Sequence, residues 1–286
     1  MEPTGGDGGT AVARRGTGPL ARLMREGGLY CVFQPLADLR EGQVYAHEAL
    51  IRGPQNTPLH TPDKLLELAR HEGLLQDFEL LCVYTAMEQW GRHDAPGRLF
   101  VNISADALVH GVQLIGATEL GNTVRSLGLS ARMLVLEITE SQLMQDCTST
   151  LIALRELGSL GVRLALDDFG TGYSSLGYLK RFPLHILKVD KSFIGGSDAE
   201  SRAISRAIIG LGRSLGLEVV AEGVERDEHL DFLRRERCSL AQGYWFSRPR
   251  PAAELQRLFA GEDCFEGLWC LLPERSASQP CQDSQA

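Results

Sequence analysis

Asp167 and Asp168 are the residues whose types and spacing point most directly to chemistry. An apolar run ends at Leu166, the two acids follow, and a glycine-containing loop begins at Gly170. Neighbouring side chains on a strand point to opposite faces, so two adjacent carboxylates share one site only where the strand gives way to a loop. A hard divalent cation is the usual counter-charge for such a pair. Taken alone, an Asp-Asp pair is more often a solvated acidic turn than a metal site.

The same arrangement recurs along the chain, because many apolar, strand-like runs end in a polar residue. These end residues are Gln34, Glu48, Asn102, Glu137, Lys188, Glu222 and Gln242. Strands separated by helices pair in parallel, since each crossover needs about a dozen residues. Strand ends spaced roughly 20 to 35 residues apart fit an α/β fold, the TIM (β/α)8 barrel, whose active site lies at the carboxyl ends of its strands. An open doubly wound sheet is the alternative, but it would gather the polar ends near one switch point.

Helical patterns lie between most of the predicted strands. We expect helices at 62–71, 75–90, 113–127, 148–157, 199–215, 226–235 and 252–259. The connection from Tyr30 to Glu48 is too short for a helical crossover and carries Asp38 and Gly42, which are typical of a hairpin. The sequence therefore predicts a modified barrel whose first strand is antiparallel to its neighbour.

Composition indicates one large domain with polar tails. The chain has 286 residues and 43% hydrophobic content, enough for one barrel core. We expect a disordered, Gly/Arg-rich segment at 1–28, the barrel at 29–262, and a C-terminal extension at 263–286 that is largely disordered from about 273. No apolar run approaches the roughly 20 residues of a membrane span, and no signal peptide begins the sequence.

The net charge and the cysteines indicate which binding partners and which cellular compartment to expect. The net charge of −8 argues against a nucleic-acid polymer as partner. The seven cysteines are odd in number and lack a Cys-x-x-Cys spacing, so a disulfide framework or a thiolate zinc site is not expected. A reducing, cytoplasmic location suits them better.

In a barrel, the polar strand ends converge on one mouth. The converging ligands are five carboxylates and one amide: Glu48, Asn102, Glu137, Asp167, Asp168 and Glu222. Oxygen donors of this kind suit Mg²⁺ or Mn²⁺. Five negative charges exceed what one divalent ion offsets, so we expect two ions, the arrangement used for phosphoryl transfer.

Two cations near this mouth have functional and structural interpretations. Lys188 is the only cation among the strand ends, and it could orient an attacking water or steady charge on a phosphate; a salt bridge to Asp190 is the structural alternative. Arg52, four residues after Glu48, is either a phosphate clamp or a surface arginine.

The segment Glu48-Ala49-Leu50-Ile51-Arg52 resembles the motif that names the EAL domain, a family of bacterial cyclic di-GMP phosphodiesterases. The other sequence blocks typical of this family lie on both sides of that motif, in family-like order, and the resemblance extends from about Leu29 to Phe259. They are Phe33-Gln34-Pro35-Leu36, Val101-Asn102-Ile103-Ser104, Glu137-Ile138-Thr139-Glu140, Asp167-Asp168-Phe169-Gly170-Thr171-Gly172, Lys188-Val189-Asp190, Ala221-Glu222-Gly223-Val224-Glu225 and Gln242-Gly243-Tyr244-Trp245-Phe246-Ser247.

The resemblance implies a function and a role for each matching residue. The implied reaction is metal-dependent hydrolysis of cyclic di-GMP to linear pGpG, with Mg²⁺ or Mn²⁺ as cofactor and Ca²⁺ as inhibitor. One metal would be held by Glu48, Asn102, Glu137 and Asp167. The other would be held by Asp167 and Asp168, with Glu222 coordinating it or its water. The catalytic residues would be Lys188, Glu222 and Glu48. Substrate or site water would contact Gln34, Arg52, Asp190 and Gln242. Loop support would come from Glu140, which anchors the Asp167-Asp168 loop, and Glu225, which braces the Glu222 turn.

The architecture departs from many relatives, in which this domain is fused to a diguanylate cyclase or a sensor. No Gly-Gly-Asp-Glu-Phe motif is present, so the chain is either a stand-alone enzyme or part of a longer protein with a regulatory domain elsewhere. The resemblance also implies a homodimer. Two further functions stay open: a cyclic di-GMP receptor or scaffold with little turnover, and a barrel enzyme acting on a different phosphodiester.

Overall fold

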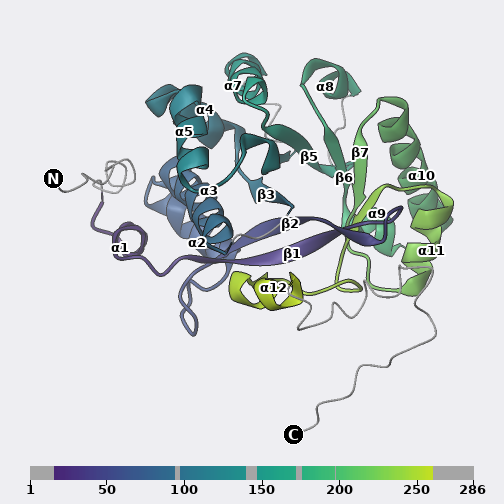
Figure 1. Cartoon of the computed structure of the whole chain (residues 1–286), viewed down its shortest axis with the longest axis horizontal. Helices are drawn as coiled ribbons and strands as arrows, with labels where there is room; N and C mark the ends of the chain where they lie inside the picture. Colours follow the sequence, from purple (N-terminus) through teal and green to yellow (C-terminus); the bar gives the residue numbers. More distant parts are fainter. Residues whose placement is uncertain (1–15, 94–96, 140–146, 172–175, 197, 260–286) are drawn as a thin grey trace, which may run out of the picture.

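The central element of the protein is a closed barrel of parallel strands with one antiparallel member (Figure 1). The computed structural model describes residues 16–93, 97–139, 147–171, 176–196 and 198–259. The strands are β1 (Tyr30–Asp38), β2 (Gln43–Arg52), β3 (Arg98–Asn102), β4 (Leu134–Thr139), β5 (Arg163–Phe169), β6 (Ile186–Val189), β7 (Glu218–Ala221), β8 (Leu240–Gln242) and β9 (Arg250–Pro251).

Strand β1 closes the barrel, because it pairs with both β2 and β8 and is antiparallel to each. Strands β2 to β8 pair in parallel in the order of the sequence. The short β9 adds to the other side of β1. The predicted barrel and its antiparallel first strand are therefore confirmed, and the open doubly wound sheet is excluded.

Most helices cover the outside of the barrel between successive strands (Figure 1). They are α1 (Pro19–Glu26), α2 (Pro62–His71), α3 (Leu75–Arg92), α4 (Ala105–Ile115), α5 (Ala117–Ser126), α7 (Cys147–Ser159), α8 (Leu176–Arg181), α9 (Lys191–Gly195), α10 (Ala199–Ser214), α11 (Asp227–Arg235) and α12 (Ala252–Phe259), with a short 3₁₀ helix at Ala131–Met133.

One predicted helix, at 113–127, is wrong in its start. The structure has two helices there, α4 and α5, separated by Gly116, whose φ is 81°. Glycine adopts this left-handed backbone without the steric cost of a Cβ, so the chain changes direction at Gly116. Helix α4 begins earlier, where Ser104 caps it by accepting a hydrogen bond from the backbone N–H of Ala107.

Part of the N-terminal segment predicted to be disordered is a helix. Helix α1 buries Leu20 and Ala21 against α2 and α3 in an apolar cluster that includes Leu65 and Phe78. The carboxylate of Glu72 accepts hydrogen bonds from the first backbone N–H groups of α1, at 2.9 Å from Leu20 and 3.1 Å from Ala21. Since a helix start leaves such donors unpaired, this contact stabilises α1 where no side chain of its own caps it. Residues 1–15 and 260–286 lie outside the described residues.

The interior of the barrel is filled by one layer of apolar side chains from all eight of its strands. These side chains are Leu36, Ala46, Phe100, Val135, Ala165, Ile186, Val220 and Leu240, each of them fully buried. A larger core lies between the strands and the surrounding helices. The filled interior separates the two ends of the barrel, so polar groups at the carboxyl ends form a site distinct from those at the amino ends.

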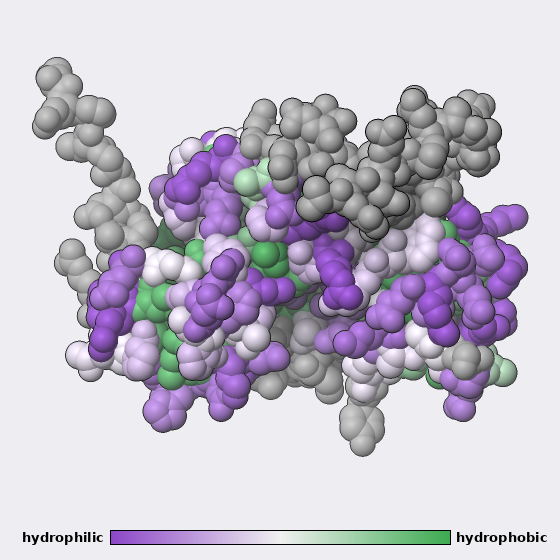
Figure 2. All heavy atoms as spheres, turned by 90° about the horizontal axis from the view of Figure 1, so that it is seen from below, coloured by the Kyte–Doolittle hydropathy of each residue, from purple (hydrophilic) through white to green (hydrophobic). Residues whose placement is uncertain are grey.

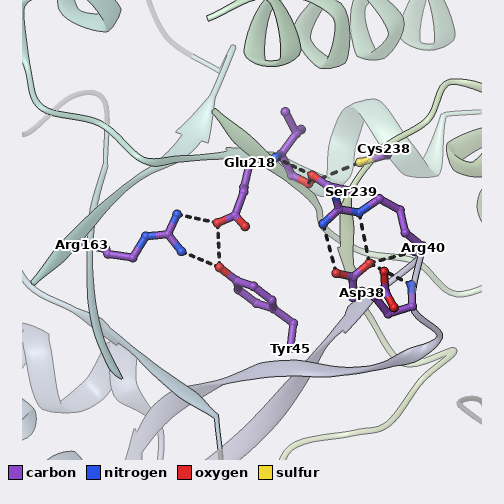
Figure 3. A network of polar contacts seen from close by, with 9 residues as sticks. Asp38, Arg40, Tyr45, Arg163, Glu218, Cys238 and Ser239 are labelled. Atoms are coloured by element: carbon purple, nitrogen blue, oxygen red, sulfur yellow. Dashed lines mark hydrogen bonds and ion pairs between the residues drawn. The ribbon is translucent and has the colours of Figure 1, made fainter. Parts of the chain in front are cut away.

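A polar network lies at the amino ends of the strands (Figure 3). The hydroxyl of Tyr45 donates a hydrogen bond to Glu218 over 2.6 Å, and Arg163 contacts both residues. Beside it, Asp38 accepts a backbone hydrogen bond from Arg40 and forms an ion pair with it. Burial and the bond to Glu218 raise the pKa of Tyr45 to about 12, so its hydroxyl stays a donor. In barrels of this kind the end opposite the active site generally serves stability.

Hydrophilic side chains cover most of the coloured part of the face seen in Figure 2, and apolar atoms are visible mainly in recesses between them. This agrees with amphipathic helices that turn their apolar sides to the barrel. Within the described ranges, no helix combines the length and apolar character needed to cross a membrane.

Candidate active site at the carboxyl ends of the strands

Lys188 lies at the centre of the polar groups at the barrel mouth. Its Nζ is 2.7 Å from a Glu222 oxygen, 2.8 Å from Glu137 Oε1, 3.1 Å from Asp167 Oδ1 and 3.8 Å from Glu48 Oε2. The residue is only 1% exposed, although a buried lysine is costly without partners. Four carboxylates from β2, β4, β5 and the residue after β7 therefore surround one buried ammonium group. The salt bridge to Asp190, the structural alternative, is not among the ion pairs of the described residues.

Strand register accounts for the convergence of these side chains. Parallel pairing sets Asn102 of β3 beside Glu137 of β4, and antiparallel pairing sets Gln34 of β1 opposite Glu48 of β2. Side chains alternate along each strand, so the inward residues on the carboxyl side of β2 to β8, and on the amino side of the antiparallel β1, point into the mouth above the apolar layer. The polar ends predicted from the sequence thus meet at one place.

A bulge lets both aspartates reach the site. The pairing of β5 with β6 shifts register between Leu166 and Phe169, and Asp168 has a φ of 55°, a left-handed value uncommon outside glycine. The extra residue of a bulge re-aims a side chain. Oxygens of Asp167, Asp168 and Glu222 consequently lie within 4.8 Å of one another. The sequence predicted that the strand ends before this pair. In the structure, β5 continues through both aspartates to Phe169, and the bulge brings their two side chains to the same site.

The amide side chains complete the mouth by binding Glu48. Asn102 donates from Nδ2 to Glu48 Oε1 over 2.9 Å, and Gln242 donates from Nε2 to Glu48 Oε2 over 2.7 Å. Gln242 also donates to Gln34, whose own amide nitrogen donates to the backbone oxygen of Ser247. These bonds hold the Glu48 carboxylate in one orientation and link β1, β2, β3 and β8.

The environment shifts the pKa values of the acids in opposite directions. Burial alone would raise the pKa of Glu48, but Lys188 and the amide hydrogen bonds outweigh it and lower the pKa. Burial and the nearby charge of Glu48 raise the pKa of Glu137. Burial raises the pKa of Glu222 to about 7. Burial and the charge of Asp167 raise the pKa of Asp168. Such shifts are typical of sites where like charges are held together for function.

The lysine shows the reverse balance. Burial lowers the pKa of Lys188, but the charges of Asp167, Glu137, Glu222 and Glu48 more than compensate, so its pKa lies well above the usual value. Lys188 therefore holds its proton at neutral pH and acts as a hydrogen-bond donor and a fixed positive charge.

The oxygen atoms at the mouth are suitable ligands for divalent metal ions. Both carboxylate oxygens of Glu137 and Oδ1 of Asp167 are buried and, apart from the ion pairs with Lys188, have no donor in the described part of the chain. One lysine offsets one of the five negative charges at the mouth. Oxygen ligands with excess negative charge are those that Mg²⁺ and Mn²⁺ prefer.

The remaining predicted residues lie at the edge of this cluster or outside the described residues. Arg52 is at the end of β2, where its guanidinium donates to the backbone oxygen of Ile51. Asp190 follows β6 and caps α9 by accepting from the backbone N–H of Ser192. Glu225 lies in the turn before α11, and its backbone N–H donates to His229. Glu140 lies outside the described residues, so its loop-anchor role stays a prediction.

Comparison with known proteins assigns the chain to a family. The model of the EAL domain matches residues 19–249, most of the chain. The cyclic di-GMP phosphodiesterase NbdA of Pseudomonas aeruginosa is 40% identical over 244 residues, which cover 83% of this chain and 31% of NbdA. The chain therefore belongs to the EAL domain family, the cyclic di-GMP phosphodiesterase family, and it spans about a third of that curated relative.

Solved structures agree in fold. A cyclic di-GMP complex of the PaMucR phosphodiesterase matches with a TM-score of 0.71 and 37% identity, covering 80% of this chain and 100% of that one. Klebsiella pneumoniae BlrP1 with manganese and cyclic di-GMP matches with a TM-score of 0.71 and 28% identity, covering 78% of this chain and 56% of that one. A calcium complex of BlrP1 with the same ligand is also similar.

Proposed function

We propose that this chain hydrolyses cyclic di-GMP to linear pGpG. The observation that carries the proposal is the set of four acids around Lys188 at the barrel mouth, with Asn102 bonded to Glu48 and Asp168 close to Asp167 and Glu222. Membership of the family and the name of NbdA supply the substrate. Because the chain covers only 31% of NbdA, its activity needs its own test.

The proposed cofactors are two Mg²⁺ or Mn²⁺ ions. Glu48, Asn102, Glu137 and Asp167 would hold one of them, and Asp167, Asp168 and Glu222 the other. When bound, such a pair stabilises charge on the attacking and leaving oxygens of a phosphate ester. The cyclic di-GMP complexes of BlrP1 with manganese and with calcium support the choice of divalent ions.

The chain's own residues would position water and move its proton. In hydrolysis the water oxygen bonds to phosphorus, one P–O ester bond breaks, and the freed hydroxyl group gains a proton. Lys188 keeps its own proton, so it would orient the water by donation and would not act as the base. Glu222, which lies 2.7 Å from the Lys188 ammonium group, is the carboxylate that would take up the proton of the water or coordinate that water through the metal. Gln34, Arg52, Asp190 and Gln242 would contact the substrate or site water.

A receptor that binds cyclic di-GMP without turnover is the second candidate. It needs a binding surface but not the whole set of charged ligands, whose mutual repulsion costs stability. The completeness of the set therefore favours the enzyme. A homodimer, a cytoplasmic location and a regulatory domain outside this chain remain expectations.

The test is to incubate the purified chain with cyclic di-GMP and Mn²⁺ and to quantify pGpG by chromatography. We expect pGpG from the wild type, none from Glu48→Gln, and wild-type activity from Glu67→Gln, an exposed acid on α2. Binding without any pGpG would favour the receptor. Cleavage of linear or mononucleotide diesters in preference would point to another phosphodiesterase.

The choice of metal is a second test of the same site. Mg²⁺ requires near-octahedral geometry at about 2.0–2.1 Å, whereas Ca²⁺ accepts roughly 2.3–2.6 Å and looser coordination. We expect Mg²⁺ or Mn²⁺ to support turnover and Ca²⁺ to permit binding while suppressing turnover. Equal rates with Ca²⁺ and Mg²⁺ would contradict a tight two-metal geometry.

A further inference from the structure

A cavity of about 250 Å³ lies beside the active site, between the barrel and helices α2 and α3. Asn102 and Glu137 line it on the side of the barrel mouth, and Glu79 of α3 lines it together with Ser104. Glu79 belongs to none of the motifs described above, and its carboxylate is the only acidic group of α2 or α3 that lines this cavity.

Glu79 ties helix α3 to the turn that follows β3. Its Oε2 accepts a hydrogen bond from the backbone N–H of Ser104 at 3.1 Å and a second, short one from the Ser104 hydroxyl. The same hydroxyl accepts from the backbone N–H of Ala107 and so caps α4. Bonds to a carboxylate are about twice as strong as neutral ones. The half-buried Glu79 therefore fixes the junction between β3 and α4.

That junction carries a proposed metal ligand, Asn102. Asn102 lies beside Glu137 in the pairing of β3 with β4, and the backbone N–H of the next residue, Ile103, donates to the Glu137 backbone oxygen. Downstream, Ser104 is the next residue with side-chain bonds, and its partner is Glu79. The Asn102 side chain itself is exposed at the strand end and donates to Glu48. The backbone bonds of Ile103 and Ser104, directly after Asn102, therefore fix the position from which the Asn102 side chain projects.

We propose that Glu79 is a positioning residue for the Asn102 metal ligand. It touches neither the proposed metals nor the acids, and it acts through Ser104 by holding the β3–α4 turn against α3. Groups that orient metal ligands from outside commonly change metal affinity or activity by about 10–100-fold when removed. The inference rests on the metal site of the proposed function, and only its kcat part rests on the proposed hydrolysis as well.

The test compares Glu79→Ala with Glu79→Gln. Both bonds from Ser104 end on one oxygen, so the amide oxygen of glutamine can accept them without the charge. We expect Glu79→Ala to weaken Mn²⁺ binding about tenfold by calorimetric titration and to lower kcat more than it changes KM for cyclic di-GMP. Glu79→Gln should recover most of both. Glu88→Ala, a change at a surface ion pair on the same helix, is the matched control and should behave as wild type.

A double-variant experiment checks the route through Ser104. If Glu79 acts through that residue, Ser104→Ala combined with Glu79→Ala should weaken Mn²⁺ binding less than the product of the two single changes. Unchanged Mn²⁺ affinity in Glu79→Ala, with only a lower unfolding temperature, would mean that Glu79 merely joins two helices and would overturn the proposal. A wild type that binds Mn²⁺ but makes no pGpG would defeat the proposed function and leave this test of Glu79 intact.

Discussion

Lys188 decides the electrostatics of the mouth at the scale of single residues. Its ammonium group is the one positive charge in contact with Glu137, Asp167 and Glu222 within the described structure. Removing it leaves three neighbouring acids without a buried counter-charge, and each acid then favours its protonated form. The lysine therefore matters both for the chemistry and for the stability of the site.

Lys188→Met is expected to lower turnover by about 10²–10³-fold, the usual cost of removing a fixed hydrogen-bond donor from the reacting oxygen atoms. Since the loss of the cation raises the pKa values of the acids, these acids hold more protons in the folded variant than in the folded wild type. Its stability deficit should therefore shrink as the pH falls from 8 to 6. Urea unfolding at both pH values in a chelating buffer measures this, and a deficit independent of pH would contradict the assignment.

Asp168→Asn tests the second predicted metal position. Asparagine tolerates the left-handed backbone that Asp168 adopts, so the bulge should survive. The change removes a charge from a site where burial and Asp167 already raise the pKa of Asp168. We expect kcat to fall by several orders of magnitude and stability in a chelating buffer to stay equal or to rise. Asp106→Asn, at an exposed position of α4, is the control. A large loss of thermal stability in Asp168→Asn would mean that Asp168 is structural.

Much of the candidate site was predictable at this scale, because a barrel brings the inward residues of successive strand ends together. Lys188, Glu48 and Glu137 follow directly from that rule. Glu79 was not predictable, since it lies inside helix α3 away from any strand end, and its partner Ser104 is distant in the sequence. The mixed polar and apolar pattern of α3 does not distinguish a residue facing the site from one facing solvent.

At the scale of elements, the ends of β5 serve two different purposes. Its carboxyl end carries the bulged aspartates, and its amino end carries Arg163, which joins Tyr45 and Glu218 across the barrel (Figure 3). Next to that end, the backbone N–H of Leu164 donates to Nδ1 of His185 over 3.2 Å. His185 therefore links β5 to the start of β6 through a ring nitrogen that must be unprotonated.

His185 is expected to make stability depend on pH. Burial and the charge of Arg163 lower the pKa of His185 below its usual value. The folded state then binds fewer protons than the unfolded state as the pH falls through about 6.5, so folding stability is lost in that range. His185→Asn keeps an acceptor near the position of Nδ1 but does not titrate.

Urea unfolding of the wild type and of His185→Asn between pH 7.5 and 5.5 measures this effect. The wild type should lose more stability than the variant on acidification. His71→Asn, at an exposed position of α2, tests whether the loss of any histidine has the same result. Parallel curves for the wild type and His185→Asn would show that His185 makes no contribution.

Helices and strands were predicted well where the apolar periodicity and the residues typical of helix ends indicate the same boundaries. They were predicted poorly where one of these signals is missing. Helix α2 runs from Pro62 to His71 as its Pro start and apolar period predict. Helix α1 was missed because its eight residues follow a Gly-rich stretch, and its order depends on Glu72, a residue far along the chain. The bulge in β5 was missed because two adjacent acids favour a loop in any local pattern.

At the scale of the whole molecule, repulsion among the acids at the barrel mouth lowers the free energy of unfolding. Bound metal ions should raise it again. Held together, the five acids repel one another, and ions that bind only the folded state add stability. A concentration of 100 times the dissociation constant adds about 2.7 kcal/mol. For a chain of this size, about 2–4 °C per kcal/mol gives a rise in unfolding temperature of roughly 5–10 °C.

We therefore expect Mn²⁺ to raise the unfolding temperature in thermal scans against a chelating buffer, and Ca²⁺ to raise it too, since stabilisation needs binding and not turnover. The double variant Asp168→Asn with Glu222→Gln converts two of the three carboxylates whose oxygens lie within 4.8 Å of one another into neutral amides, so it should lose much of the rise. Glu67→Gln with Glu254→Gln, two acids away from the mouth, removes the same charge and should keep the rise. An equal loss in both double variants would mean that the ions act through net charge, and no rise in the wild type at millimolar Mn²⁺ would mean that the mouth does not hold the metals.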